Sequence, residues 1–108
     1  MKFCTDYVMR QIKIPRETYL KIKSYCFDRK ISLVCFYEIM LDWFLNKYQH
    51  NNSLIYHAST KQGCVLSLWI NPVQISQISQ MARKANVSDA RVIYTAMMLY
   101  QENIPQLA

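Results

Sequence analysis

Glycine is almost absent from this chain of 108 residues, since Gly63 is the only one, and only three prolines occur. Disordered segments are rich in these residues and poor in hydrophobic ones, whereas hydrophobic residues make up 52% of this chain. The composition therefore predicts a folded domain with a packed interior. A single glycine also excludes a glycine-rich loop that cradles phosphates, so no nucleotide-binding loop is expected.

Long hydrophobic runs are missing as well. No stretch of about 18 apolar residues occurs, which predicts that the chain has no membrane span. The first residues, Met1 to Tyr7, lack the apolar core of a signal peptide. We therefore expect a cytoplasmic protein with reduced thiols.

The four cysteines form no C-x-x-C pair, and His50 and His57 have no ligand spacing with them. Structural zinc sites have closely spaced ligand pairs, so we expect no metal site and buried apolar thiols instead. Cys26 and Cys35 in particular are expected on apolar helical faces. No serine lies in a nucleophile motif, and neither an enzymatic activity nor a cofactor is predicted.

Acidic residues are outnumbered by basic ones, because 13 Lys and Arg against seven Asp and Glu give a formal net charge of +6. Both halves of the chain share this excess. It favours a polyanionic partner such as nucleic acid, although a modest basic excess is also common in proteins that bind nothing acidic.

Two short runs alternate between apolar and polar residues and end at a proline, the first from Val8 to Pro15 and the second from Val65 to Pro72. Alternation with a period of two is typical of a strand with one face on a core. A proline suits the first turn of a helix better than a central strand. Because one strand of this length is not stable alone, we predict that the two runs pair with each other.

Helical patterns follow each run. Apolar residues recur every three or four positions in residues 16–29, and Ser32 then precedes a strongly apolar second helix. In the second half, Asn71 and Ser88 are the expected N-caps of two helices, and Asn86 is expected to end the first of them in the left-handed conformation. Each half thus has the predicted order strand, helix, helix, which is an internal repeat.

We interpret the chain as a single domain of residues 1–108, of the α+β class and mostly helical. The first motif covers residues 8–46 and the second residues 64–104, with a polar linker at residues 47–63. Within the linker, the apolar patch from Leu54 to Tyr56 is compatible either with an extension of the preceding helix or with a short strand.

Two copies of a strand, a capped helix, a turn, a serine cap and an apolar helix resemble the ribbon-helix-helix DNA-binding proteins, among them Arc and the methionine repressor. The tandem form is similar to the TraY-type proteins of conjugative DNA transfer, where one polypeptide supplies both strands. In the second half, the residues at the family's core and turn positions are Leu68, Ile70, Ile78, Ala82, Asn86, Ser88, Ile93 and Ala96. In the first half they are Ile12, Ile14, Ile22, Cys26, Ser32, Tyr37 and Met40. Lys30 departs from the pattern, since the family usually has glycine there.

The resemblance implies an intramolecular pseudo-dimer, in which the two strands form an antiparallel ribbon that enters the DNA major groove over a core of four helices. It places six side chains on the face turned to the groove: Met9, Gln11, Lys13, Val65, Ser67 and Trp69. Gln11 and Lys13 suit the edges of adenine and guanine. Val65 and Ser67 are less able to distinguish one base from another, and Trp69 could instead pack on sugars or on a protein partner. The alternative is an ordinary solvated strand face.

Phosphates could also be held by the free N–H groups at the starts of the second helices, near Ser32 and Leu33 in the first half and near Ser88 in the second. Asp89 adds negative charge at the latter, and simple helix capping explains both serines without DNA. Five cations are candidates for flanking contacts, although each could be only a surface charge: Arg10, Arg16, Lys30, Lys61 and Arg91.

These features predict a sequence-specific double-stranded DNA-binding protein that regulates transcription, as repressor or activator, in a mobile or conjugative element such as a plasmid. One alternative is an accessory protein of the relaxosome at a transfer origin. Another is a protein-interaction module that has lost DNA reading. Besides DNA, the expected partners are RNA polymerase, relaxosome proteins or further copies of the chain on DNA. Binding to a membrane is not expected.

Overall fold

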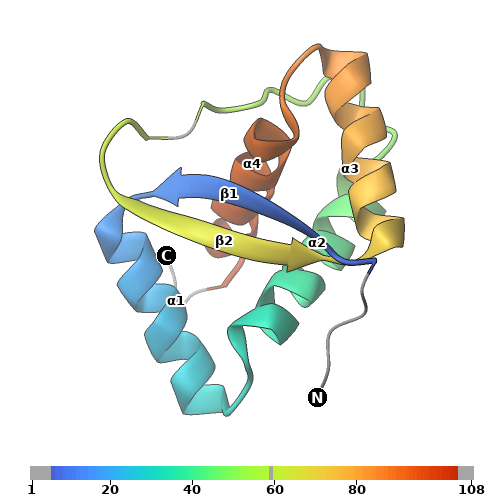
Figure 1. Cartoon of the computed structure of the whole chain (residues 1–108). Helices are drawn as coiled ribbons and strands as arrows, with labels where there is room; N and C mark the ends of the chain where they lie inside the picture. The colour runs from blue at the N-terminus through green and yellow to red at the C-terminus, as the bar shows by residue number, and fades with distance from the viewer. Residues whose placement is uncertain (1–5, 59, 105–108) are drawn as a thin grey trace.

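The computed structural model describes residues 6–58 and 60–104, which form two strands and four helices (Figure 1). The fold is α+β and mostly helical, as the sequence predicts. Each element of the second half begins the same number of residues after its counterpart in the first half. The elements are β1 (Val8–Ile14), α1 (Arg16–Arg29), α2 (Leu33–Tyr48), β2 (Cys64–Ile70), α3 (Pro72–Ala85) and α4 (Asp89–Glu102).

The two strands pair with each other into an antiparallel two-stranded ribbon, which confirms the predicted pairing of the two alternating runs. Val8 lies opposite Ile70, Gln11 opposite Ser67 and Ile14 opposite Cys64. In Figure 1 the ribbon passes in front of α4, with α1 at one end and α3 at the other. The inner face of the ribbon contributes five buried side chains to the core: Ile12, Ile14, Leu66, Leu68 and Ile70.

The N-terminal caps of three helices are those that the sequence predicts. The side chains of Ser32, Asn71 and Ser88 each accept a hydrogen bond from the backbone N–H three residues later. Pro72 is the first residue of α3, where its missing N–H leaves no helical hydrogen bond unmade. These caps fix where α2, α3 and α4 begin relative to the ribbon.

Helices α1 and α3 both end on a residue in the left-handed conformation, Lys30 with φ 56° and Asn86 with φ 58°. In each case the N–H of this residue donates to the carbonyl three residues earlier, and the next N–H donates to the carbonyl five residues before it. The two turns are therefore equivalent, although one is formed by a lysine and the other by an asparagine. A lysine pays a steric cost in this conformation that glycine avoids.

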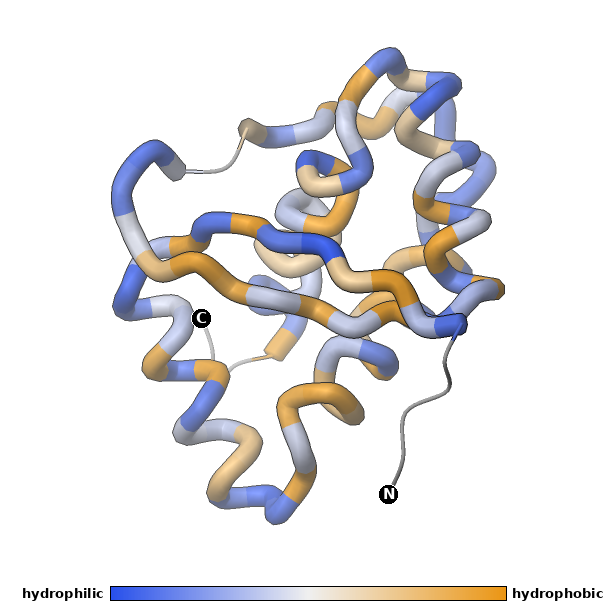
Figure 2. The backbone as a smooth tube through the Cα atoms, in the orientation of Figure 1, coloured by the Kyte–Doolittle hydropathy of each residue, from blue (hydrophilic) through white to orange (hydrophobic). Residues whose placement is uncertain are grey.

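The core is formed mainly by α2 and α4 packed beneath the ribbon. Phe36 of α2 is 2% exposed and contacts three other aromatic rings edge-on, those of Tyr25, Tyr37 and Tyr100, at centroid distances of 5.7 to 5.9 Å. These contacts join α1, α2 and α4 around one side chain. Figure 2 shows how hydrophobic residues are interspersed with hydrophilic ones along the strands and helices.

The described part of the loop between α2 and β2 contains neither a helix nor a strand, so the patch from Leu54 to Tyr56 neither extends α2 nor adds a strand. Hydrogen bonds of three loop residues, Tyr56, His57 and Thr60, help to hold this loop against the rest of the domain. Arg91 Nη2 donates to the carbonyl of Tyr56 at 3.2 Å, the His57 N–H to the Thr95 hydroxyl at 2.9 Å, and the Thr60 hydroxyl to the carbonyl of Lys13 at 3.2 Å.

Gly63 ends the loop immediately before β2 and has φ 142°, which side-chain-bearing residues rarely adopt. A Cβ atom at this position would lie 2.1 Å from the carbonyl oxygen of Ile14. The single glycine of the chain is therefore placed where the loop backbone lies against the end of β1. None of the described helices is long and apolar enough to cross a membrane.

Candidate functional site

The outward face of the ribbon brings together the six side chains that the sequence suggests for base contacts. The register pairs Met9 with Trp69, Gln11 with Ser67, and Lys13 with Val65. Because alternate residues of a strand point to opposite faces, all six lie on the side away from the core. Met9, Trp69 and Val65 are 38%, 44% and 58% exposed, although all three are large and hydrophobic. This face is therefore open to a partner.

Two hydrogen bonds on this face involve exposed polar groups. Gln11 Nε2 donates to the Ser67 hydroxyl at 3.3 Å, in the middle of the ribbon. Lys13 Nζ donates to the carbonyl of Lys61 at 3.2 Å, in the loop beside the ribbon. Exposed bonds of this kind contribute little stability and can be exchanged for bonds to a ligand. The ribbon is thus polar at its centre, apolar at the end with Met9 and Trp69, and mixed at the end where Lys13 lies opposite Val65.

Arg10 is on the inner side of the ribbon, where its guanidinium is engaged by Asp89 at the start of α4. Arg10 Nε and Nη2 both donate to Asp89 Oδ2 at 3.2 Å, and the Ser79 hydroxyl donates to the same oxygen at 3.0 Å. This ion pair joins β1, α3 and α4. The phosphate contact suggested for Arg10 stays a prediction, and it requires this guanidinium to share or leave Asp89.

The starts of α2 and α4 differ in charge. The first turn of α2, after Ser32 and Leu33, contains no acidic residue, whereas Asp89 is the first residue of α4 after Ser88. Asp89 places its carboxylate near the free N–H groups, and Arg10 compensates that charge. The suggested phosphate contacts at the two helix starts are thus electrostatically unequal, with α2 the more favourable for an anion.

Four further cations suggested for phosphate contacts are all exposed: Arg16, Lys30, Lys61 and Arg91. Arg16 begins α1 directly after the ribbon, and Lys61 accepts the Lys13 bond through its carbonyl, so these two flank one ribbon end. Lys30 lies at the far end of α1, about 20 Å along the helix from Arg16. Arg91 is bonded to the loop carbonyl of Tyr56. Arg16 and Lys61 are therefore better placed than Lys30 to accompany the ribbon.

The cysteines fit only part of the prediction. Cys26 is buried, and burial raises the pKa of its thiol, so it stays protonated. The prediction of a buried thiol at Cys35 is wrong, because Cys35 is exposed. It lies on the solvent side of α2 with Ile39 and Asp42, at a spacing of three or four residues. The described residues contain no group of three or more His, Cys, Asp or Glu side chains that could hold a metal ion.

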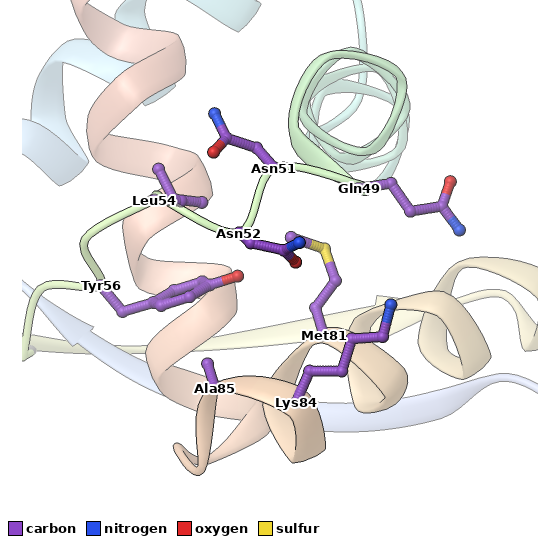
Figure 3. A pocket seen from close by; sticks show the side chains of 8 residues that line it. All are labelled: Gln49, Asn51, Asn52, Leu54, Tyr56, Met81, Lys84 and Ala85. Atoms are coloured by element: carbon purple, nitrogen blue, oxygen red, sulfur yellow. The ribbon is translucent and has the colours of Figure 1, made fainter.

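A pocket of about 360 Å³ lies between the loop and the last turns of α3 (Figure 3). Lys84 is the one charged side chain among its lining residues, and burial raises the pKa of the Tyr56 phenol there, so the phenol stays neutral. The lining has no carboxylate, histidine or thiol that could move a proton or attack a substrate. It includes none of the six ribbon side chains, and consists of Gln49, Asn51, Asn52, Leu54, Tyr56, Met81, Lys84 and Ala85.

The outward face of the ribbon is the surface on which the predicted functional residues gather. Comparison of the chain with protein-family models, with curated proteins and with solved structures finds no match. The candidate site is accordingly defined by its own geometry, an exposed two-stranded ribbon with Gln11 and Ser67 at its centre and Arg16 and Lys61 beside one end.

Proposed function

We propose that this chain is a sequence-specific double-stranded DNA-binding protein of the ribbon-helix-helix type, which inserts the β1–β2 ribbon into the major groove and regulates transcription. The observation that carries the proposal is the register of the ribbon, which gathers six side chains on one outward face, five of them exposed and Lys13 half-buried. A major groove about 12 Å wide admits a two-stranded ribbon, and each base pair presents there a distinct pattern of donors and acceptors.

The spacing of the elements supports a tandem arrangement, in which one chain supplies both halves of the binding unit. Val8 of β1 corresponds to Cys64 of β2, and the same spacing makes Gln11 correspond to Ser67. The register also places Gln11 directly opposite Ser67. A pair of residues that are both equivalent and opposite lies on an approximate two-fold axis, as in a ribbon formed by two chains.

The chemistry of the face supports reading of base edges. The Gln11 amide can form two hydrogen bonds with an adenine, and the Lys13 ammonium can donate to a guanine. Val65 can contact a thymine methyl group, and Ser67 can donate or accept. Arg16, Lys61 and the start of α2 would position the ribbon through phosphates, which carry no sequence information themselves. The net charge of +6 favours this encounter.

The proposal includes a role in a mobile or conjugative element, for which the sequence resemblance to TraY-type proteins is the support. Binding at a transfer origin, as an accessory of the relaxosome, would use the same ribbon and the same contacts. The two roles differ in the location of the bound site and in the partners beside it, RNA polymerase for one and relaxosome proteins for the other.

A second candidate function is docking of a protein on the same face. It is favoured by the three hydrophobic side chains there, since Met9, Val65 and Trp69 are between 38% and 58% exposed. Apolar side chains exposed together on one face commonly mark protein contacts. In this case Gln11, at the centre of the face, and Lys13, opposite Val65, would contact the protein partner instead of base edges.

Titration of the full chain with random duplex at increasing salt distinguishes the two functions. DNA binding should weaken steeply, with a slope of the logarithm of affinity of about −0.9 for each phosphate contacted. Lys61→Ala, which removes a cation proposed to contact phosphate, should reduce this slope, whereas Lys84→Ala, which removes an exposed cation at the end of α3, serves as the matched control. Absence of salt-dependent binding to any duplex would favour the docking function. Selection of bound fragments from random DNA then identifies the preferred site.

A further inference from the structure

One face of α1 alternates basic and hydrophobic residues, all of them exposed. We call this face the α1 stripe, and it consists of Arg16, Leu20, Lys23, Phe27 and Lys30. Steps of four, three and four residues keep Arg16, Leu20, Lys23 and Phe27 on one side of the helix, and Lys30 follows immediately after the end of α1. Leu20 is 50% exposed and Phe27 is 83% exposed. The acidic residues of α1, Glu17 and Asp28, lie at other positions around the helix, so the stripe itself is purely basic and apolar.

The equivalent face of α3 lacks this character. Its residues at the same spacing are Pro72, Ser76, Ser79, Arg83 and Asn86. Leu20 thus corresponds to Ser76, and Phe27 corresponds to Arg83. Because α3 occupies the equivalent place in the fold with polar residues at these positions, neither folding nor the ribbon requires Leu20 and Phe27 to be hydrophobic. The α1 stripe is a property of the first half alone.

Single exposed hydrophobic residues are ordinary on protein surfaces, but this pair is spaced for recognition. Leu20 and Phe27 are seven residues apart, so their side chains lie about 10 Å from each other along one face of the helix. A partner helix presents apolar side chains at that same interval. Arg16, Lys23 and Lys30 lie before, between and after the two, so a matching partner carries carboxylates around its apolar residues.

We propose that the α1 stripe is a docking surface for an acidic segment of another protein, which places two apolar side chains about one heptad apart against Leu20 and Phe27. Its carboxylates pair with Arg16, Lys23 and Lys30. The proposal is independent of DNA binding, because none of its residues except Arg16 lies near the ribbon. It assigns partner recruitment to α1 and leaves the outward face of the ribbon to a different ligand.

Charge and apolar area favour an acidic protein segment over two other partners, a second copy of the chain and a membrane. A second copy of the chain would bring three cations of one stripe against three of the other, in a protein that already carries a net charge of +6. An anionic membrane would match the cations, but two hydrophobic side chains on a helix of 14 residues provide little apolar area for insertion. An acidic segment with two apolar residues satisfies both the charge and the hydrophobic surface.

The experiment is selection from a library of random peptides displayed on phage, with the full chain as bait. The double variant Leu20→Ser and Phe27→Arg, which gives α1 the residues of α3, is used for counter-selection. Enriched peptides should contain Asp or Glu around two apolar residues seven positions apart. The affinity of these peptides for the double variant, measured by fluorescence anisotropy, should be at least tenfold lower than for the original chain. Their affinity for the original chain should fall as salt is added, and their affinity for the Lys23→Glu variant should also be lower.

Three controls make the result specific. Ile55→Ser changes another exposed hydrophobic residue, 76% exposed in the loop, and should leave peptide affinity unchanged. Thermal unfolding of the double variant should match that of the original chain, since both substituted side chains are exposed. Gln11→Ala should not alter peptide binding, and the double variant should not alter DNA binding, so failure of one proposal is separable from failure of the other.

Several outcomes would overturn the proposal. One is that no peptide distinguishes the original chain from the double variant. Another is binding to vesicles of phosphatidylserine and phosphatidylcholine that is lost in the double variant, which would assign the stripe to a membrane surface. A third is concentration-dependent self-association that the double variant abolishes, which would assign the stripe to a second copy of the chain.

Discussion

Gln11 and Ser67 lie directly opposite each other at the centre of the ribbon, and the Gln11 amide donates a hydrogen bond of 3.3 Å to the Ser67 hydroxyl. The two residues are also equivalent in the two halves of the chain, yet they differ in size and in hydrogen-bonding groups. Met9 and Val65 are also equivalent in the two halves but differ chemically, and so are Lys13 and Trp69. The ribbon is therefore regular in its backbone and asymmetric in its chemistry.

Gln11 and Lys13 are expected to carry most of the sequence selectivity. Changing either residue to alanine should cost about 1–3 kcal/mol of binding free energy on the preferred site, because a base-edge contact is lost, and much less on random duplex. Competition titrations with the two DNAs measure the difference. Equal losses on both DNAs would mean that these side chains contact only phosphates. Ile55→Ala, in the loop, is the neutral control.

The asymmetry of the ribbon predicts a non-palindromic site. A homodimer presents identical side chains twice about its two-fold axis, which favours a palindrome, whereas a single chain of this kind is not so constrained. Trp69→Ala should lower affinity without changing the preferred bases next to Gln11, whereas Gln11→Ala should relax them. Selection of DNA by each variant tests this. An inverted repeat with equally constrained halves, spanned by one bound chain, would contradict it.

The two halves of the chain should depend on each other for folding. The core faces of both strands meet in one interior, where Ile12 and Ile14 pack with Leu66 and Leu68. Residues 1–50 expressed alone would leave that face uncovered, so they should be unfolded or self-associate. Circular dichroism and sedimentation equilibrium measure both properties. A stable monomer of residues 1–50 would rule out the tandem arrangement.

Lys30→Gly should stabilise the protein by roughly 1 kcal/mol. The left-handed conformation costs a side-chain-bearing residue roughly 1–2 kcal/mol, and the greater flexibility of unfolded glycine offsets about 0.5–1 kcal/mol of the gain. Asn86→Gly should have a smaller effect, since asparagine tolerates this conformation. Urea unfolding measures both. Arg29→Gly, one residue earlier inside α1, is the matched control and should destabilise by about 1 kcal/mol.

Tyr37 is 3% exposed, and its hydroxyl has no hydrogen-bond partner among the described residues. Tyr37→Phe should therefore stabilise the protein by about 1 kcal/mol at neutral pH, because it removes an unsatisfied buried group. Burial, together with nearby Tyr19 and Cys26, raises the pKa of the Tyr37 phenol above its ordinary value of about 10. If Tyr37→Phe lowered the free energy of unfolding instead, the Tyr37 hydroxyl would have to be hydrogen-bonded, which would contradict the prediction.

The same shift gives a pH dependence with a defined sign. A raised pKa in the folded state means that the neutral phenol contributes its full stability below about pH 10 and that this contribution is lost as the pH rises further. Tyr100, whose pKa burial also raises, contributes in the same direction. Urea unfolding at a series of alkaline pH values should show a shallower decline for Tyr37→Phe than for the original chain. Parallel declines would contradict the assignment to Tyr37.

The sequence by itself determined the local features of this protein. The alternation in β1 and β2 fixes which side chains share a face, since a strand has a period of two. The caps at Ser32, Asn71 and Ser88 are bonds between a side chain and a backbone N–H three residues away, so they are visible in the sequence as well. Because the period of a strand is local too, the six outward side chains of the ribbon could be named from the sequence.

The tertiary structure alone decided the contacts between distant segments. Nothing near Arg10 in the sequence shows its partner, because Asp89, at the start of α4, engages it from 79 residues away. Cys35 looked apolar, and its exposure depends on which side of α2 the core covers. Lys30 takes the left-handed conformation that its residue type disfavours, because the packing of α1 against α2 requires a turn at that point. Long-range packing energies outweigh such local preferences, and no pattern of neighbouring residues encodes them.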